Sequence, residues 1–310
     1  MGDISKSIGD VVKEVCLVNK EFLDLAEQLK SSVSCTVRLN ELMSGHTSFK
    51  IGGPADILVL PESIEQLREV LKVVKETVVP LTLLGNGSNV LVRDKGIRGI
   101  VIKLGNMLRH FYEAEDLLVF GSGYSLALAS YKAMECGKTG MEFAVGIPGS
   151  IGGAVYMNAG AYDGEMQNIV NCVKVMDLQG NERVLTAEEL NFGYRKTSLQ
   201  NSGLIVTEVT LKMPSGNKDE IKSKMDDFSH RRISKQPLEM PSAGSMFKRP
   251  PGYFAGTLID QAGLKGYTVG GAQISTKHAG FVVNVGGATA ADVLQLIKDV
   301  QTKIKAGVGV

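Results

Sequence analysis

Two glycine-rich stretches are the parts of this sequence whose residue types and spacing could do chemistry. Residues 84–92 read LGNGSNVLV, and residues 146–160 read GIPGSIGGAVYMNAG. Consecutive backbone N–H groups in such loops form a concave anion site, and the missing side chains let a ligand lie against the main chain. One such loop alone is more often an ordinary tight turn, but two together indicate a dinucleotide.

The residues expected to contact this dinucleotide fall in the two loops. They are Gly85, Asn86, Gly87, Ser88 and Asn89 in the first loop, and Gly146, Gly149, Ser150, Gly152 and Gly153 in the second. A third stretch, GSGYSL at 121–126, is similar to a dinucleotide fingerprint. Leu126 replaces its third glycine, and no acidic residue ends a second strand about 20 residues later, so this stretch is predicted to begin a helix.

The composition restricts the class of protein. A chain of 310 residues with 44% apolar and 22% charged residues can bury the cores of two or three domains. A formal net charge of +1 gives no electrostatic reason to expect nucleic acid, and no apolar run is long enough to span a membrane. The four cysteines are widely spaced, which predicts neither a metal site nor a disulfide framework. We therefore expect a cytoplasmic protein whose partners are small molecules.

Hydrophobic periodicity and capping residues predict an α+β protein. Capping boxes begin predicted helices after Ser63 and Thr289. An amphipathic helix over 17–30 comes first, and a strand, a helix and a second strand then lead into the first glycine-rich loop. Residues 214–217 are the most plausible linker. The predicted strands are 57–60, 81–84, 98–104, 116–120, 170–178, 182–185, 204–213 and 281–285.

Several motifs, in the right order over about residues 40–305, resemble those of one family. They are HTSFKIGGPAD at 46–56, LGNGSN at 84–89, GIPGSIGG at 146–153 with MNAG at 157–160, FGYRK at 192–196, SAGSMFKR at 242–249, and GGAQ at 270–273 with KHAG at 277–280. The sequence is similar to the UDP-N-acetylenolpyruvoylglucosamine reductases (MurB) of bacterial peptidoglycan synthesis. The short spacing from Arg195 to Ser245 resembles the subtype without an extra substrate-covering loop.

The resemblance implies a two-subdomain FAD-binding fold of the p-cresol methylhydroxylase type and a C-terminal α+β domain for the UDP-sugar. On this basis residues 1–45 are an N-terminal helical segment, 46–104 and 105–213 are the two FAD-binding subdomains, and 214–310 are the substrate-binding domain. Neither glycine-rich loop contains histidine or cysteine, so FAD is expected to be bound without a covalent link.

The resemblance also implies the reaction. NADPH reduces the flavin and leaves, and UDP-N-acetylglucosamine enolpyruvate then takes hydride from flavin N5 at its C3 carbon. Arg195 matches the family arginine that stabilises the charge, and Ser245 matches the proton donor to C2. Lys235 and Arg249 are candidates for binding the diphosphate. Outside these motifs, such an arginine or serine would be interpreted as a surface or turn residue.

Two other functions stay open from the sequence: another FAD-dependent oxidase of the same fold, and a UDP-sugar-binding protein without catalysis. His278 is expected to be a structural residue or a substrate contact rather than a metal ligand, because the four histidines lie far apart. No residue pattern indicates the oligomeric state or a preference for NADPH over NADH.

One family residue has no counterpart here. Members of the family carry a catalytic glutamate in a short strand after the final helix, whereas no glutamate follows Glu239 in this sequence. The only later acids are Asp260, Asp292 and Asp299. We expect the natural chain to continue beyond Val310, so that its intact mass exceeds that of these residues. If it does not, Asp260 is the first candidate to replace the missing acid.

Overall fold

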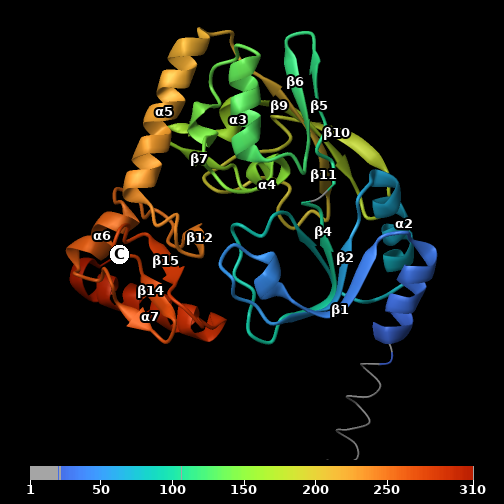
Figure 1. The fold of residues 1–310 in the computed structure, drawn as a ribbon, viewed down its shortest axis with the longest axis horizontal. Coiled ribbons are helices and arrows are strands. Elements are labelled where there is room, and N and C mark those ends of the chain that lie inside the picture. The colour runs from blue at the N-terminus through green and yellow to red at the C-terminus, as the bar shows by residue number, and fades with distance from the viewer. Residues whose placement is uncertain (1–19, 21, 106, 310) are drawn as a thin grey trace, which may run out of the picture.

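The computed structural model describes residue 20, residues 22–105 and residues 107–309, and its strands form three main sheets (Figure 1). Residues 22–32 are helical, in agreement with the helix predicted over 17–30. The first part of that predicted helix, including Val18, lies outside the described residues. The apolar side chains Leu25, Ala26 and Leu29 are buried against the first sheet and its helix, as helical spacing requires.

The first sheet has the strand order β1-β2-β4-β3. Its strands are β1 (Thr36–Leu42), β2 (Pro54–Leu60), β3 (Leu81–Leu84) and β4 (Ile97–Lys103). Both β2 and β3 run parallel to β4, so β4 lies between the two strands that the helix α2 (Ile64–Lys75) connects. The strand, helix and strand predicted before the first loop are present, and β3 ends where the first glycine-rich loop begins.

The cap of α2 confirms the predicted helix start with one difference. Gln66 N–H donates to Ser63 Oγ over 3.2 Å, as a capping box requires. The Gln66 side chain, however, accepts from the N–H of Glu62 rather than from that of Ser63.

β1 corrects the prediction that residues 1–45 are a helical segment. Residues Thr36–Leu42 form an edge strand antiparallel to β2, with Val37 opposite Val59. Polar and apolar residues alternate only from Thr36 to Asn40, and only Val37 is buried. An edge strand of this kind has a weak hydrophobic signal, which is why its sequence does not stand out.

The second sheet is antiparallel, with the order β10-β9-β11-β6-β5. The helices α3 (Leu126–Glu135) and α4 (Ile151–Tyr156) pack on it around a large apolar core. Ser125 caps α3, which confirms that the GSGYSL stretch begins a helix. The strands of this unit are β5 (Phe111–Ala114), β6 (Leu117–Gly121), β9 (Val170–Met176), β10 (Glu182–Thr186) and β11 (Ile205–Lys212), with the short hairpin β7 (Gly160–Ala161) and β8 (Gly164–Glu165).

The helix α5 (Lys218–Lys235) connects the second unit to the C-terminal unit, and Figure 1 shows it running beside α3. Its buried side chains Ile221, Met225 and Phe228 pack with Val145 of the second unit. In packing terms the boundary of the C-terminal unit therefore lies after α5, near residue 236, rather than at 214 as the linker composition suggested. The 214–217 stretch is held to the end of α3, where Gly216 N–H donates to Gly137 O over 2.9 Å.

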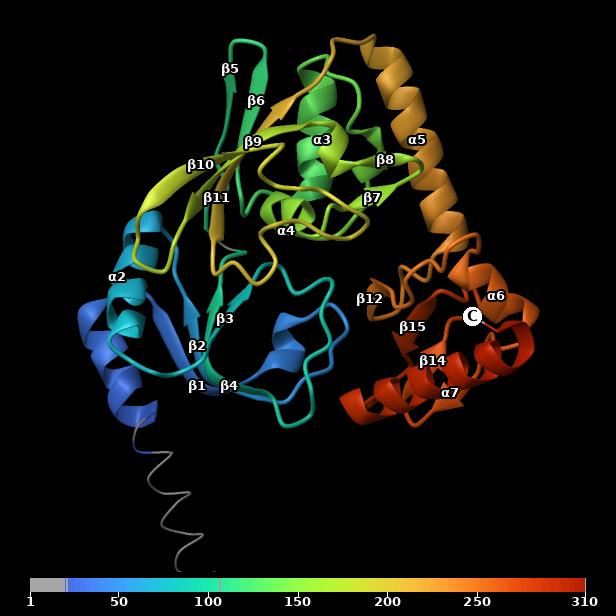
Figure 2. The ribbon, with the colours of Figure 1, turned by 180° about the vertical axis from the view of Figure 1, so that it is seen from behind.

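The C-terminal unit has a sheet of order β12-β15-β14-β13 covered by two helices (Figure 2). Phe49 and Ile51, from the segment between β1 and β2, are buried in its core. The Asp94 carboxylate accepts from the N–H groups of Ala290 and Ala291 at the start of the last helix. The elements are β12 (Ser242–Ser245), α6 (Ala255–Gln261), β13 (Thr268–Val269), β14 (Ala272–Ile274), β15 (Phe281–Asn284) and α7 (Ala290–Val308).

Candidate active site

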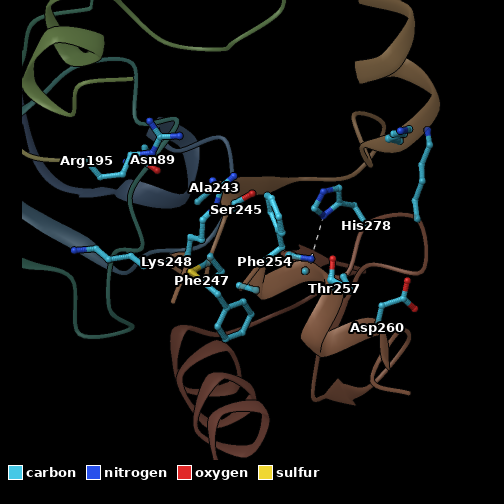
Figure 3. Close-up of a pocket in the computed structure, with 18 of the residues that line it drawn as sticks. Asn89, Arg195, Ala243, Ser245, Phe247, Lys248, Phe254, Thr257, Asp260 and His278 are labelled. Atoms are coloured by element: carbon cyan, nitrogen blue, oxygen red, sulfur yellow. Dashed lines mark hydrogen bonds between the residues drawn. The ribbon is translucent and has the colours of Figure 1, made fainter. Parts of the chain in front are cut away.

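A cavity of about 1070 Å³ lies where the first two units face the C-terminal unit. It brings together five of the predicted site residues: Asn89, Arg195, Lys235, Ser245 and Arg249. In Figure 3, Arg195 and Asn89 lie on one side of the cavity, Asp260 and Thr257 on the other, and Ser245 between them.

Arg195 lies at the corner of a tight turn. Gly193 and Lys196 exchange two backbone hydrogen bonds of 2.9 and 3.1 Å, which leaves Arg195 at the third position of the turn with φ of +57°. Its guanidinium donates to the carbonyls of Asn158 and Gly160 over 3.0 and 2.8 Å. Since an arginine has five N–H donors, this anchoring leaves others available for a carboxylate in the cavity.

Ser245 ends β12 and pairs with Phe281 of β15. Its side chain is exposed to the cavity, and its hydroxyl makes no hydrogen bond with any residue that the structure describes. The backbone of the next residue is held, since Met246 N–H donates to Gly280 O over 2.9 Å. The strand therefore fixes the backbone at Ser245, while the hydroxyl has no hydrogen-bond partner among the described residues.

The two glycine-rich loops lie in contact, as a shared ligand would require. Ser88 Oγ of the first loop donates to Pro148 O of the second over 3.2 Å. Gly149 and Gly85 are also close to the opposite loop, because an added β carbon would lie 2.9 Å from Ser88 Oγ and 3.3 Å from Ser150 Oγ respectively. Each loop therefore needs a small residue where it faces the other.

Gly153 has the surroundings expected of a ligand contact. It is exposed, and a β carbon there would meet only Ser150 Oγ, at 3.4 Å, among the atoms within contact range. Ser150 caps α4 by accepting from Gly153 N–H. One side of this glycine is therefore open, beside the contact between the two loops.

Gly152, Gly87 and Gly146 have packing roles that the sequence did not reveal. The N–H of Gly152 donates to Ser122 O over 2.9 Å, and an added β carbon would lie 2.7 Å from Ser122 Cβ. A β carbon on Gly87 would overlap His46 O, and one on Gly146 would lie 2.9 Å from Arg232 Cδ. The N–H of Gly152 is thus bonded to the protein, and its expected contact with the cofactor stays a prediction.

The remaining loop residues differ in their position relative to the cavity. Asn86 lies over Gly105, where its side-chain oxygen occupies the space that a β carbon would fill. Asn89 lines the cavity directly.

A group beside the first loop was missed from the sequence. Lys103 ends β4 opposite Leu84, and its Nζ lies 3.3 Å from His46 Nδ1. His46 Nε2 in turn lies 2.8 Å from Glu41 Oε1. Burial lowers the pKa of the Lys103 ammonium, which an anion would counteract. Only the pairing of β3 with β4 brings this lysine to the loop, so no local pattern could have identified it.

The cavity as a whole is strongly basic. Among the described residues its lining includes six cationic side chains and one carboxylate, that of Asp260. The Arg249 guanidinium lies 4.2 Å from the centre of the Phe254 ring, and Arg249 N–H donates to Tyr194 Oη over 3.3 Å. A surface of this charge favours a polyanion such as a diphosphate. The cationic residues are Arg195, Lys235, Lys248, Arg249, Lys265 and Lys277.

His278 also lines the cavity, and its ring is held by the backbone. Its Nδ1 accepts from Gly280 N–H over 3.1 Å, so the neutral ring carries its proton on Nε2. Burial lowers the pKa of His278 below its ordinary value of 6.5. Within the described residues no group of three or more His, Cys, Asp or Glu side chains could hold a metal ion.

The three acids that follow Glu239 have different roles. Asp260 lines the cavity and pairs with Lys265 over 2.7 Å. Asp292 completes the capping box of α7 with Thr289, which confirms the predicted helix start. Asp299 accepts from Tyr267 Oη over 2.8 Å. Only Asp260 of these three therefore faces the site.

Comparisons with known proteins agree with this architecture. The sequence model of the UDP-N-acetylenolpyruvoylglucosamine reductase C-terminal domain matches residues 236–310, and an FAD-binding-domain model matches residues 55–186. No helix in the described part of the chain is long and apolar enough to cross a membrane.

Similar proteins that match over most of their length have the same family name. The UDP-N-acetylenolpyruvoylglucosamine reductase of Clostridioides difficile strain 630 is 49% identical over 274 residues, which cover 88% of this chain and 90% of the relative. That of Clostridium perfringens strain SM101 is 50% identical over 285 residues, covering 92% and 93%. The crystal structure of the MurB enzyme of Thermus caldophilus superposes with a TM-score of 0.76 at 40% identity, covering 86% of this chain and 95% of the other. The chain therefore belongs to the UDP-N-acetylenolpyruvoylglucosamine reductase family and is an FAD-dependent oxidoreductase with the FAD-binding fold of the p-cresol methylhydroxylase type and a C-terminal α+β domain.

Proposed function

We propose that this protein uses NADPH to reduce UDP-N-acetylglucosamine enolpyruvate to UDP-N-acetylmuramate for peptidoglycan synthesis. The observation that carries the proposal is one cavity lined by Arg195 from the FAD-binding part and by Ser245 from the C-terminal domain. We assign the protein to the subtype without an extra substrate-covering loop, because the segment between these two residues is short. The cytoplasm is its expected compartment.

The two glycine-rich loops would hold the FAD pyrophosphate. Support comes from the contact between Ser88 and Pro148 and from the open side of Gly153. Lys103, beside the first loop, adds a cation at the same place. When bound, the flavin passes a hydride from the nicotinamide to the substrate. The first two sheet units would form the FAD-binding subdomains, and the unit from about residue 236 would bind the UDP-sugar.

Arg195 would stabilise the charge that develops on the substrate. Hydride added at C3 leaves a carbanion at C2, which is delocalised into the adjacent carboxylate. The Arg195 guanidinium is always protonated and can donate two hydrogen bonds to that carboxylate. Because two carbonyls already anchor the guanidinium, little reorganisation is needed as the charge forms.

Ser245 would then complete the addition across the double bond. Its O–H proton goes to C2, so that C3 gains the hydride, C2 gains the proton and the serine becomes an alkoxide that solvent reprotonates. A serine is a weak acid, but the carbanion is a much stronger base. Lys235 and Arg249 would bind the diphosphate and hold the substrate at the distance that this transfer needs.

Half-reaction kinetics test the proposal. The purified yellow protein should lose its oxidised-flavin absorbance when mixed with NADPH without oxygen, and should regain it when the enolpyruvyl substrate is added. In D2O the product should carry deuterium at C2, where the proton comes from the serine hydroxyl and so from solvent. Reoxidation by oxygen alone, with stoichiometric peroxide and no effect of the UDP-sugar, would contradict the proposal and identify an oxidase.

A further inference from the structure

Asn158 is a fully buried polar residue beside Arg195. Its exposed fraction is 0%, and it follows α4 in the second glycine-rich motif. Its backbone is in the left-handed region, with φ of +41°. A buried asparagine in this conformation is costly unless its amide and its backbone are both well bonded, so its partners indicate what it supports.

The side chain of Asn158 connects three segments. Its Nδ2 donates to Gly193 O over 3.0 Å and to Glu165 Oε2 over 3.1 Å. Its Oδ1 accepts from Gln167 N–H over 3.0 Å. These partners determine which amide atom is which, because a carbonyl needs a donor and a backbone N–H needs an acceptor. Asn158 therefore has specific bonds that no apolar residue could replace.

Two of the Asn158 contacts lead to Arg195. Gly193 begins the tight turn that carries Arg195, and the Asn158 amide holds the carbonyl of that glycine. The backbone carbonyl of Asn158 accepts directly from Arg195 Nη1 over 3.0 Å. Asn158 thus contacts both the base of the turn and the charged end of the side chain.

Neighbouring bonds strengthen the same connection. Thr197 Oγ1 donates to Tyr156 O over 2.9 Å, and Gln200 Nε2 donates to Arg195 O over 3.1 Å. The left-handed φ of Arg195 costs free energy that the surroundings must offset. These contacts hold the turn from both ends, and both Asn158 and Thr197 are buried.

We propose that Asn158 is a positioning residue that keeps the Arg195 guanidinium directed at the substrate carboxylate. The inference rests on the proposed role of Arg195. A free arginine side chain samples many rotamers, and a misplacement of about 1 Å at the reacting groups can cost about 10²-fold in rate. Without the Asn158 amide the turn loses the hydrogen bond at Gly193 O. The Arg195 guanidinium is then no longer fixed in position before the substrate binds.

Replacement by glycine isolates the amide. Asn158→Gly keeps the positive φ without strain and keeps the backbone carbonyl that binds Arg195, but it removes every side-chain bond. We expect normal flavin content, normal flavin reduction by NADPH, and reoxidation by the enolpyruvyl substrate slowed about 10²-fold. Asn191→Gly is the matched control, because Asn191 is exposed and has φ of +43° in the same unit. It should leave both half-reactions unchanged.

A double-mutant cycle separates positioning from a general structural role. In an Arg195→Ala background, Asn158→Gly should slow reoxidation no further, since there is no guanidinium left to position. Additive losses would overturn the inference. If Arg195→Ala alone leaves reoxidation unchanged, the proposed role of Arg195 fails. If Arg195→Ala slows reoxidation but Asn158→Gly does not, this inference alone fails.

A second variant covers the case in which the glycine variant does not fold. Asn158→Asp has the same shape and keeps the acceptor for Gln167 N–H, but it places a carboxylate against Gly193 O and Glu165. It should show the same selective loss in the second half-reaction. Loss of flavin or equal damage to both half-reactions in both variants would show that Asn158 is structural only.

Discussion

Arg195 and Ser245 line the same cavity but are held in different ways. The Arg195 guanidinium is bonded to two carbonyls, and its turn is supported by the buried Asn158. The Ser245 hydroxyl makes no hydrogen bond with a described residue, and only the strand behind it is fixed. The FAD-binding side of the cavity is therefore rigidly bonded, and the C-terminal side is more open.

The difference follows from the lengths of the two side chains. An arginine loses much rotamer entropy when it is ordered, so its charge is useful only if the protein has already fixed it. A serine has one rotatable side-chain bond before its oxygen, so a fixed backbone restricts the hydroxyl to three staggered positions. A proton donor must also be free of acceptors that would compete with the substrate carbon. The comparison predicts that substitutions on the FAD-binding side and on the C-terminal side of the cavity have different effects.

The largest expected effect comes from removing the Ser245 hydroxyl on the more open, C-terminal side of the cavity. Ser245→Ala should leave flavin reduction by NADPH nearly unchanged and slow reoxidation by the enolpyruvyl substrate about 10²- to 10⁴-fold, since only that step needs the acid. Rapid mixing measures the two half-reactions separately. Ser242→Ala, in the same strand but outside the cavity lining, is the control. Equal damage to both half-reactions would mean that the hydroxyl supports the strand instead.

Substitutions at the adjacent residues Gly152 and Gly153 test the FAD-binding side of the molecule. Gly153→Val should weaken FAD binding about 10- to 100-fold by filling the open side of the loop, while flavin-free protein unfolds at its usual temperature. Gly152→Val should instead destabilise the flavin-free protein by about 1–3 kcal/mol, because its side chain would clash with Ser122. Flavin fluorescence titration and thermal unfolding check both variants. Full FAD affinity in the Gly153 variant would remove that residue from the cofactor site.

A smaller effect is expected from the cations of the open side. Arg249→Met should raise KM for the UDP-sugar about tenfold and leave kcat near its original value, because binding the diphosphate does not change during hydride transfer. Arg183→Met, on an exposed strand residue outside the cavity, should change neither constant. A fall in kcat with unchanged KM would place Arg249 at the reacting end of the substrate.

The smallest expected effect concerns the pH dependence of the open side. Burial, with smaller contributions from Lys265 and Lys235, lowers the pKa of His278, and a backbone hydrogen bond and the Asp260 carboxylate oppose this only in part. As the pH falls, His278 takes up a proton in the unfolded chain before it does so in the folded protein. The free energy of unfolding should therefore be highest above about pH 6.5 and should fall as the pH drops below that value. Between pH 7.5 and 5.5, the Tm of the His278→Gln variant should fall about 2–4 °C less than the Tm of the unsubstituted protein. An equal loss in the variant would show that other groups cause the acid sensitivity.

Local features of the fold could be predicted from the sequence because they depend on neighbouring residues. The caps at Ser63, Ser125 and Thr289 satisfy N–H groups within three residues of the capping side chain. The glycine-rich loops follow a strand or precede a helix, as their composition indicated. Strand β1 was missed because its alternation breaks at Asn40 and Glu41, where Asn40 is left-handed, and only Val37 is buried.

Other features depend on contacts between distant segments. Phe49 and Ile51 are in the core of the C-terminal unit, although the sequence places them before the first glycine-rich loop. Helix α5 packs on the second unit through its apolar face, so composition alone set the boundary too early at 214. Gly152 proved to be a packing glycine because Ser122 lies against it, which no pattern within the loop could reveal.

The sequence by itself determined the residue types that the chemistry needs, the glycine-rich loops, the helix caps and the similarity to one enzyme family. Only the tertiary structure decided which of these residues meet. Arg195 and Ser245 come from different units, and they share a cavity because those units pack together. The support of Arg195 by Asn158 depends on two left-handed residues held by bonds across several segments. Such backbone conformations are unfavourable locally, so only long-range packing can stabilise them.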